Sequence, residues 1–255
     1  MESLDPIEPR FRRLRLYNAL MGTVHLAQGI LILFLSNDFA LPVHATFMEG
    51  PPGSVPVAMR QLFELPIGPA VASFVLISAA AHWALVLPGV LGWYCRNLGR
   101  RRNYARWVEY SFSSSIMIVL IAMLTGIGDV AALVALFGVN ASMIFFGLLQ
   151  EHYERPGGGT LLPFWLGSVA GAVPWIAIGI YLFSPGVEAS PPGFVYGIFV
   201  SLFVLFNAFA INMWLQYRRI GPWHDYLFGE SVYVLLSLTA KSLLAWQVFF
   251  PTLIG

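Results

Sequence analysis

The chain has 255 residues, of which 58% are hydrophobic and only 11% are charged, and its mean hydropathy is +0.72. This composition excludes an ordinary water-soluble globular protein and indicates an integral membrane protein. The formal net charge is only +1, and we expect no nucleic-acid partner.

Apolar runs of about 20 residues recur along the chain, and a helix of that length crosses a hydrocarbon core about 30 Å thick. Backbone amides in lipid must be bonded internally, and the runs are too long and too uniformly apolar for barrel strands. We therefore expect an all-α, multi-pass protein of the cell membrane, with residues 1–255 forming a single seven-helix bundle. The expected spans are 15–36, 66–95, 104–127, 130–152, 160–183, 193–217 and 226–250.

The arginines are distributed unevenly between the two ends of these spans. One side carries Arg10, Arg12, Arg13, Arg15, Arg96, Arg100, Arg101, Arg102, Arg106, Arg155, Arg218 and Arg219, and the other carries only Arg60. The positive-inside rule therefore predicts a cytoplasmic N-terminus and, after seven crossings, an extracellular C-terminus. The N-terminal segment lacks the short hydrophobic core and cleavage site of a signal peptide, so we expect the first helix to be retained.

The connection over about residues 37–65 is the one sizeable segment on the outer side. Its sequence "VHATFMEGPPGSVPVAM" places alternating apolar residues around a Gly/Pro turn, a pattern that fits a small β-hairpin and a plain ordered loop equally well. The length leaves room for packing across a dimer interface, and we expect a homodimer.

The last span, in "LLSLTAKSLLAWQ" (residues 235–247), contains Lys241, the only lysine in the chain. It lies roughly 15 Å deep at 1.5 Å per residue, where a charge costs at least about 2.5 to 3.5 kcal/mol. A structural ion pair between helices is one explanation. The other is chemical: burial favours the neutral amine, a nucleophile that condenses with an aldehyde to form a Schiff base, and retinal is a membrane-soluble aldehyde.

A protonated Schiff base would still be a buried cation and would require a carboxylate. Glu109, in "RWVEYSFSSSIMIVL", is the only deep acid of the third span. It lies closer to the cytoplasmic side than Lys241, but side chains lean toward their helix N-terminus, which narrows the gap. Ser237, four residues before Lys241, could meet the Schiff base or the counterion, or bond its own helix. We interpret Glu230 as an interfacial acid.

Two histidines, His25 and His82, lie in the middle of apolar spans. Each could be a neutral hydrogen-bonding residue between helices or a proton acceptor, and with Gln28 they suggest a polar pocket on the cytoplasmic side of the lysine. The spacing of metal-ligand motifs is absent, so no metal is expected. Deep side chains could line a long apolar slot or simply fill helix contacts; they are the aromatic residues Trp165, Phe206 and Trp246, with Asn140, Met143 and Ile144 from the fourth span.

In "RWVEYS", "SLTAKSLLAWQ", the two mid-span histidines and the N-inside topology, the sequence resembles the heliorhodopsins, a family of retinal-binding photoreceptors. The resemblance covers nearly the whole chain. It implies all-trans retinal on Lys241, Glu109 as counterion, Ser237 beside it, and a polar cluster of His25 and His82. It also implies chromophore contacts at Asn140, Ile144 and Trp165.

Ordinary microbial rhodopsin pumps have an aspartate four residues before the lysine and a donor carboxylate three turns beyond the counterion, where this chain has Ser237 and Leu120. The resemblance therefore implies a slow signalling photocycle, with all-trans to 13-cis isomerisation and an unknown downstream signalling partner. The alternatives are a light-driven or light-gated proton transporter and a colourless transporter that uses a Lys–Glu pair. Phosphate loops, nucleophile elbows and zinc motifs are missing, and we do not expect an enzyme.

Overall fold

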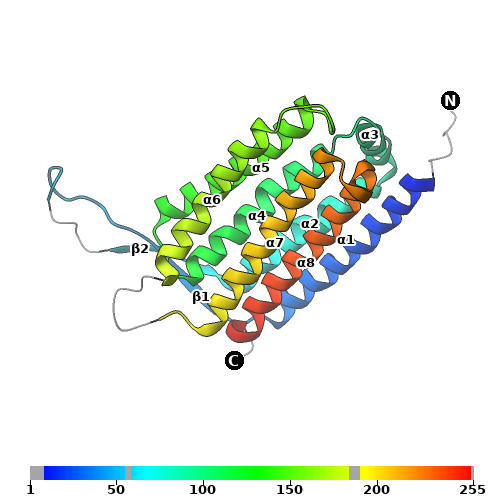
Figure 1. Cartoon of the computed structure of the whole chain (residues 1–255). Coiled ribbons are helices and arrows are strands. Elements are labelled where there is room, and N and C mark those ends of the chain that lie inside the picture. The colour runs from blue at the N-terminus through cyan, green and yellow to red at the C-terminus, as the bar shows by residue number, and fades with distance from the viewer. Residues whose placement is uncertain (1–8, 55–58, 184–189, 254–255) are drawn as a thin grey trace.

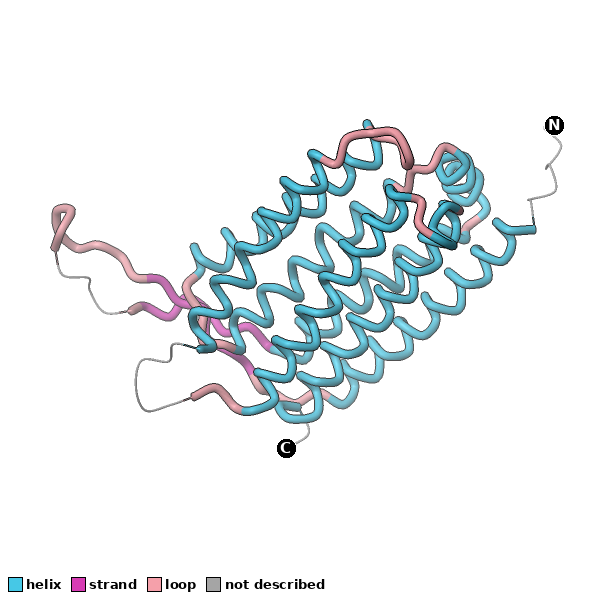
Figure 2. Tube along the Cα trace, in the orientation of Figure 1, coloured by secondary structure: helices cyan, strands magenta, loops and turns pink. Residues whose placement is uncertain are grey.

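The computed structural model describes residues 9–54, 59–183 and 190–253, and most of them are helical (Figures 1 and 2). Within these residues, seven helices are long and apolar enough to cross a membrane. The described ends of the chain lie at opposite ends of the bundle, as an odd number of crossings requires (Figure 1). The helices are α1 (Pro9–Leu35), α2 (Ile67–Val86), α3 (Pro88–Gly99), α4 (Tyr104–Leu124), α5 (Val130–Tyr153), α6 (Leu162–Phe183), α7 (Gly193–Arg218), the 3₁₀ turn η1 (Gly221–His224) and α8 (Tyr226–Leu253).

The expected second span, 66–95, was too long. The observed helix, α2, ends at Val86, because Pro88 holds Leu87 in an extended conformation with φ −65° and ψ 139°. Pro88 then begins the separate helix α3, which packs its buried Leu91, Tyr94 and Leu98 against the same end of the bundle. The apolar run continues through the break, and hydropathy alone therefore joined the two helices.

Two of the helices begin at side chains that satisfy free backbone amides. Asn103 accepts a hydrogen bond from the amide of Arg106 at the start of α4, and Asp129 accepts from the amides of Ala131 and Ala132 at the start of α5. These caps fix where α4 and α5 begin, and α4 carries Glu109.

The connection between α1 and α2 forms a hairpin, one of the two structures that its sequence allows. Strand β1 (Ala40–Ala45) pairs antiparallel with β2 (Arg60–Pro66), with an irregularity between Val43 and His44. The pair leaves the end of the bundle opposite α3 (Figure 1). The amide of His44 bonds the carbonyl of Gly128 at 3.0 Å, and this bond ties the hairpin to the α4–α5 connection.

The helices pack around the bundle in the order α1, α2, α4, α5, α6, α7 and α8, and α8 returns to contact α1 and α2. Close approach of α1 to α2 depends on small residues: a Cβ on Gly22 would lie 3.0 Å from the Cβ of His82. The largest cluster of buried apolar side chains draws on residues from most of the helices. α4 also contacts α6 and α7 across the bundle and is the most buried of the candidate spans, which places Glu109 in the interior.

Candidate functional site

Lys241 and Glu109 meet in the centre of the bundle. The Nζ of Lys241 lies 2.9 Å from Oε1 and 3.2 Å from Oε2 of Glu109, and it donates to the Oγ of Ser237 at 2.8 Å. The side chains of Lys241 and Glu109 are only 4% and 9% exposed, respectively. The extended lysine reaches back toward the start of α8, so the difference in depth between the two residues does not separate them.

The carboxylate has a further partner on α2. The hydroxyl of Ser78 donates to Oε1 of Glu109 at 2.6 Å, and Ser78 also lies 3.1 Å from the carbonyl of Phe74 in its own helix. The Nζ of Lys241 lies 5.0 Å from the ring centre of Tyr110, within the range of a cation–π contact. Side chains from α2, α4 and α8 therefore hold one buried ion pair, which compensates the cost of each charge.

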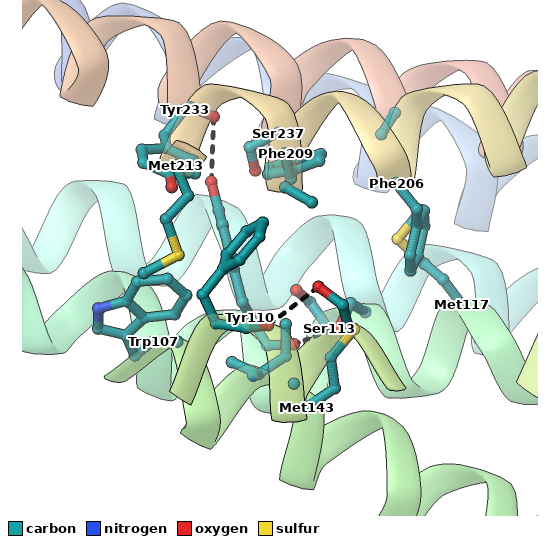
Figure 3. Close-up of a pocket in the computed structure, with 18 of the residues that line it drawn as sticks. Trp107, Tyr110, Ser113, Met117, Met143, Phe206, Phe209, Met213, Tyr233 and Ser237 are labelled. Carbon is teal, nitrogen blue, oxygen red and sulfur yellow. Dashed lines mark hydrogen bonds between the residues drawn. The ribbon is translucent and has the colours of Figure 1, made fainter. Parts of the chain in front are cut away.

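A cavity begins at Lys241 and extends between α4, α5, α6, α7 and α8. It encloses about 830 Å³ of space, including the part open to the surroundings. Figure 3 shows aromatic and sulfur-containing side chains from opposite walls projecting into it. The lining residues are Trp107, Tyr110, Ser113, Ser114, Met117, Met143, Ile144, Gly147, Pro163, Phe164, Gly167, Ser168, Phe206, Phe209, Ala210, Met213, Tyr233, Ser237, Ala240 and Lys241.

The two expected pocket residues on α5 are both close to this cavity. Ile144 lines it directly. Asn140 lies behind the wall: it is 1% exposed and donates to the hydroxyls of Ser114 at 2.8 Å and Ser115 at 3.0 Å. Ser114 lines the cavity, so the hydrogen bond from Asn140 orients one of the polar groups on the cavity wall.

Trp165, the third expected chromophore contact, is not among the residues that line this cavity. Its side chain is 56% exposed, and Phe164 lines the cavity instead. The rotation of α6 about its axis explains why Trp165 is exposed. Gly167 faces α5 so closely that a Cβ there would lie 2.9 Å from Phe146. Two residues correspond to about 200° of helical rotation, which turns Trp165 away from that face. The small residues Gly167 and Gly171 were the sequence signal for the packed face.

His25 and His82 are stacked, with ring centres 5.7 Å apart and planes 11° apart. His82 Nδ1 lies 2.8 Å from Oδ1 of Asn18, whose amide nitrogen donates to the carbonyl of Leu14. This arrangement assigns the proton to Nδ1 and leaves Nε2 of His82 able to accept one. His25 is fully buried, and neither ring nitrogen has a hydrogen-bond partner among the described residues. Gln28 does not join this pair, because it accepts from Trp246 Nε1 at 3.1 Å.

A second, smaller cavity lies on the α3 side of the ion pair. It joins His82 and Glu109 to Arg106 and Glu230, and it is also lined by Asn18, Ser78, Ala81, Leu85, Tyr94, Asn103, Ala105, Tyr110, Tyr233 and Val234. The candidate site is therefore polar on this side and apolar along the larger cavity.

Sequence reasoning missed a buried charge cluster at the far end of the second cavity. Arg106 pairs with Glu151 at 2.8 Å and also with Glu230, and all three side chains are at most 5% exposed. Glu230 is therefore not an interfacial acid: it also accepts from Asn103 at 2.7 Å. The spacing in the sequence indicates which faces these charges share. Arg106 is three residues from Glu109 on α4, and Glu230 is seven residues from Ser237 on α8, so each lies on the same helix face as a residue of the site.

Two aromatic side chains complete the cluster. Trp107 Nε1 donates to Oε2 of Glu151 at 2.6 Å, and the hydroxyl of Tyr226 donates to Oε1 at 2.8 Å. No group of three or more His, Cys, Asp or Glu side chains in the described part of the chain could hold a metal ion.

Seven helices able to span a membrane, an internal lysine–carboxylate pair and an apolar cavity beside it define a rhodopsin-like membrane bundle. The family model for Heliorhodopsin matches residues 14–253, and the chain belongs to the heliorhodopsin family. It is thus a multi-pass membrane protein of a family of light-sensing proteins whose chromophore is retinal. No curated protein matched the chain.

Proposed function

We propose that this protein is a photoreceptor in which all-trans retinal is attached to Lys241 through a protonated Schiff base, with Glu109 as its counterion. The observation that carries the proposal is the pair itself: Lys241 Nζ lies 2.9 Å from Glu109 and also lines the apolar cavity. No other side chain in the sequence has a primary amine.

The cavity suits an elongated apolar chromophore. Phe206, Phe209 and Met213 line it from α7, and Met143 and Ile144 line it from α5. These side chains bury apolar surface and exclude water from the amine end, where Glu109 and Ser237 supply the polar contacts. When bound, retinal would supply absorption of visible light and all-trans to 13-cis isomerisation.

The chain's own groups determine how a proton at Lys241 is held and where it can go. Glu109 and Ser237 hold it at Nζ through short contacts. His82 shares the second cavity with Glu109 and has an acceptor nitrogen, and His25 is stacked on it. We propose that a proton released from Nζ enters this polar side and returns by the same route, giving a slow signalling cycle without ion pumping.

The orientation of the protein belongs to the same proposal, with the arginine-rich α3 end in the cytoplasm and the C-terminus outside. Labelling intact cells with a membrane-impermeant reagent should detect a C-terminal tag and leave an N-terminal tag unlabelled until the cells are opened. The reverse labelling pattern would invert the orientation and place the polar side of the site outside.

We also propose that the chain acts as one domain, forms a homodimer and passes its signal to a separate partner. The hairpin segment presents exposed apolar side chains to its surroundings, including Phe47 at 52%, Met59 at 65% and Phe63 at 52%, which supports an interface there. Light scattering of the purified protein in detergent should give the mass of two chains, and a monomer mass would refute the dimer.

The decisive experiment is an absorption spectrum of the purified full chain after addition of all-trans retinal. We expect a visible band well to the red of free retinal, which hydroxylamine and light together remove. A protein that stays colourless would refute the retinal proposal and leave a structural or transport role for the Lys241–Glu109 pair.

A further inference from the structure

A hollow on the surface lies at the α3 end of the bundle, between the α5–α6 connection and the end of α7. It encloses about 1130 Å³, including the part open to the surroundings. It shares no residue with the cavity at Lys241. Its lining residues are Gly157, Gly158, Gly159, Thr160, Leu161, Leu162, Trp165, Tyr217 and Arg218.

The floor of this hollow is fixed by hydrogen bonds to one buried side chain. Gln150, 0% exposed, donates through Nε2 to the carbonyl of Thr160 at 2.8 Å and accepts the amide of Phe164 at 3.1 Å. Its own carbonyl accepts from the hydroxyl of Tyr217 at 2.9 Å. The amide of Gly157 bonds the carbonyl of Tyr217 at 2.9 Å. The hollow is therefore preformed, which lowers the entropic cost of binding.

The polar side of the hollow is positively charged. Arg155, Arg218 and Arg219 are exposed, and none of them forms an ion pair among the described residues. The nearby carboxylate of Glu154 is engaged through Oε2, which accepts the amide of Thr160 at 2.9 Å. Gly157, at φ +90°, lets Arg219 lie against the loop, since a Cβ there would be 2.7 Å from Arg219 Cδ. An anion in the hollow would meet the guanidinium group of Arg218, and Arg155 and Arg219 add positive charge beside it.

The other side of the hollow is apolar and faces outward. Leu162 is 58% and Trp165 is 56% exposed, and Val169 continues the same outer face of α6 at 70%. Tryptophan beside arginine at the end of a membrane helix is typical of the interfacial region, where lipid headgroups lie. A ligand that fits both sides carries an anionic group above an apolar chain.

We propose that this hollow, lined by Gly157–Leu162, Trp165, Tyr217 and Arg218 and flanked by Arg155 and Arg219, binds the phosphate headgroup of an anionic phospholipid. Arginine forks match phosphate oxygens, and basic pockets at membrane helix ends suit such headgroups. The acyl chains would lie along the outward side of α6 at Trp165 and Val169. Inorganic phosphate offers the same anionic chemistry but no apolar part, so Leu162 and Trp165 favour the lipid.

Native mass spectrometry of the purified full chain tests this proposal with phosphatidylglycerol and phosphatidylcholine of identical acyl chains. We expect wild type to retain phosphatidylglycerol preferentially and Arg218→Gln to reduce that preference about fivefold, the contribution of one arginine near an anionic surface. Arg100→Gln, an exposed arginine at the same bundle end outside the hollow, should leave it unchanged. An equal loss of lipid preference in both variants would mean that the preference comes from general surface charge, and it would overturn the proposed site.

A second pair of variants separates charge from shape. A Cβ on Gly158 would meet no atom within 4 Å, so Gly158→Asp and Gly158→Asn both fit, and only the first adds a negative charge. We expect Gly158→Asp to lower retention of phosphatidylglycerol and Gly158→Asn to preserve it, with circular dichroism confirming that both fold. Equal retention by the two variants, or displacement of the lipid by inorganic phosphate alone, would overturn the proposal. Neither result depends on whether retinal binds.

Discussion

The two halves of the bundle differ on either side of Lys241. Toward α3, the interior contains buried charged or titratable groups: Glu109, His82 and the cluster of Arg106, Glu151 and Glu230. Toward the hairpin, α4 and α8 bury Ile118, Leu120, Ile121, Leu244, Val248 and Phe249 at 0 to 1% exposure. After Lys241, α8 has no acid, base or histidine through Leu253.

This difference teaches how one membrane bundle can hold charges in its interior. The ions Arg106, Glu109 and Glu230 on the α3 side each have a partner of opposite charge within hydrogen-bond distance, and all three line one cavity. On the hairpin side, neither α4 after Tyr110 nor α8 between Lys241 and Leu253 carries an acid, a base or a histidine. The following predictions test whether the polar half carries the chemistry.

The largest effect should follow removal of the amine at the boundary between the halves. Lys241→Ala should abolish the visible band completely, because the sequence contains no other lysine that could form the linkage. The measurement is the absorption spectrum after addition of all-trans retinal. Thr239→Ala, an exposed position two residues away, is the control and should keep its colour. A coloured Lys241→Ala protein would contradict the linkage.

Arg106 tests the polar half as a structural unit. Arg106→Leu leaves Glu151 and Glu230 buried without their cation, and it should lower stability by about 3 to 5 kcal/mol. Thermal unfolding in detergent, followed by circular dichroism, measures the loss. Arg101→Gln, at an exposed position, is the control. Unchanged unfolding of Arg106→Leu would mean that the cluster contributes little to the fold.

Glu109 tests the electrostatics at the boundary itself. Glu109→Gln should red-shift the visible band and lower the pH at which that band is lost by about 1 to 3 units, because the protonated linkage loses the opposite charge 2.9 Å away. A spectrophotometric pH titration measures both effects. Glu230→Gln makes the same chemical change beside Arg106 and should shift the band less. Equal shifts in both variants would assign the counterion role to the wider cluster.

Much of the helical fold could be predicted, because the length and hydropathy of each span depend on local sequence alone. Six of the expected spans end within a few residues of their helices, and the second failed only where Pro88 interrupts a continuous apolar run. The hairpin was an open choice, since its Gly/Pro turn fits a loop equally well. Its pairing between residues 40–45 and 60–66 depends on contacts that a linear pattern does not specify.

The approach of Lys241 to Glu109 could be predicted because each is the only deep group of its charge on its helix. The Arg106 cluster could not, since hydropathy counts Arg106, Glu151 and Glu230 as charges near helix ends. Their mutual pairing across α4, α5 and α8 is a property of packing. The direction of Trp165 also depends on packing: the rotation of α6, set by Gly167 against Phe146, turns this side chain outward.

The smallest expected effect concerns ion transport: illumination should produce no steady photocurrent. Directional transport requires acceptors and donors on both sides of the lysine, and the hairpin half of α4 offers none from Tyr110 through Leu124 except neutral serines and Tyr110 itself. A proton that enters the His82 side must return the same way. We expect voltage-clamped cells to show at most a brief light-induced charge displacement in wild type and none in Lys241→Ala. A sustained current in wild type alone would show that serine hydroxyls, Tyr110 and water complete a path through the apolar half, and the protein would then be a light-driven or light-gated transporter.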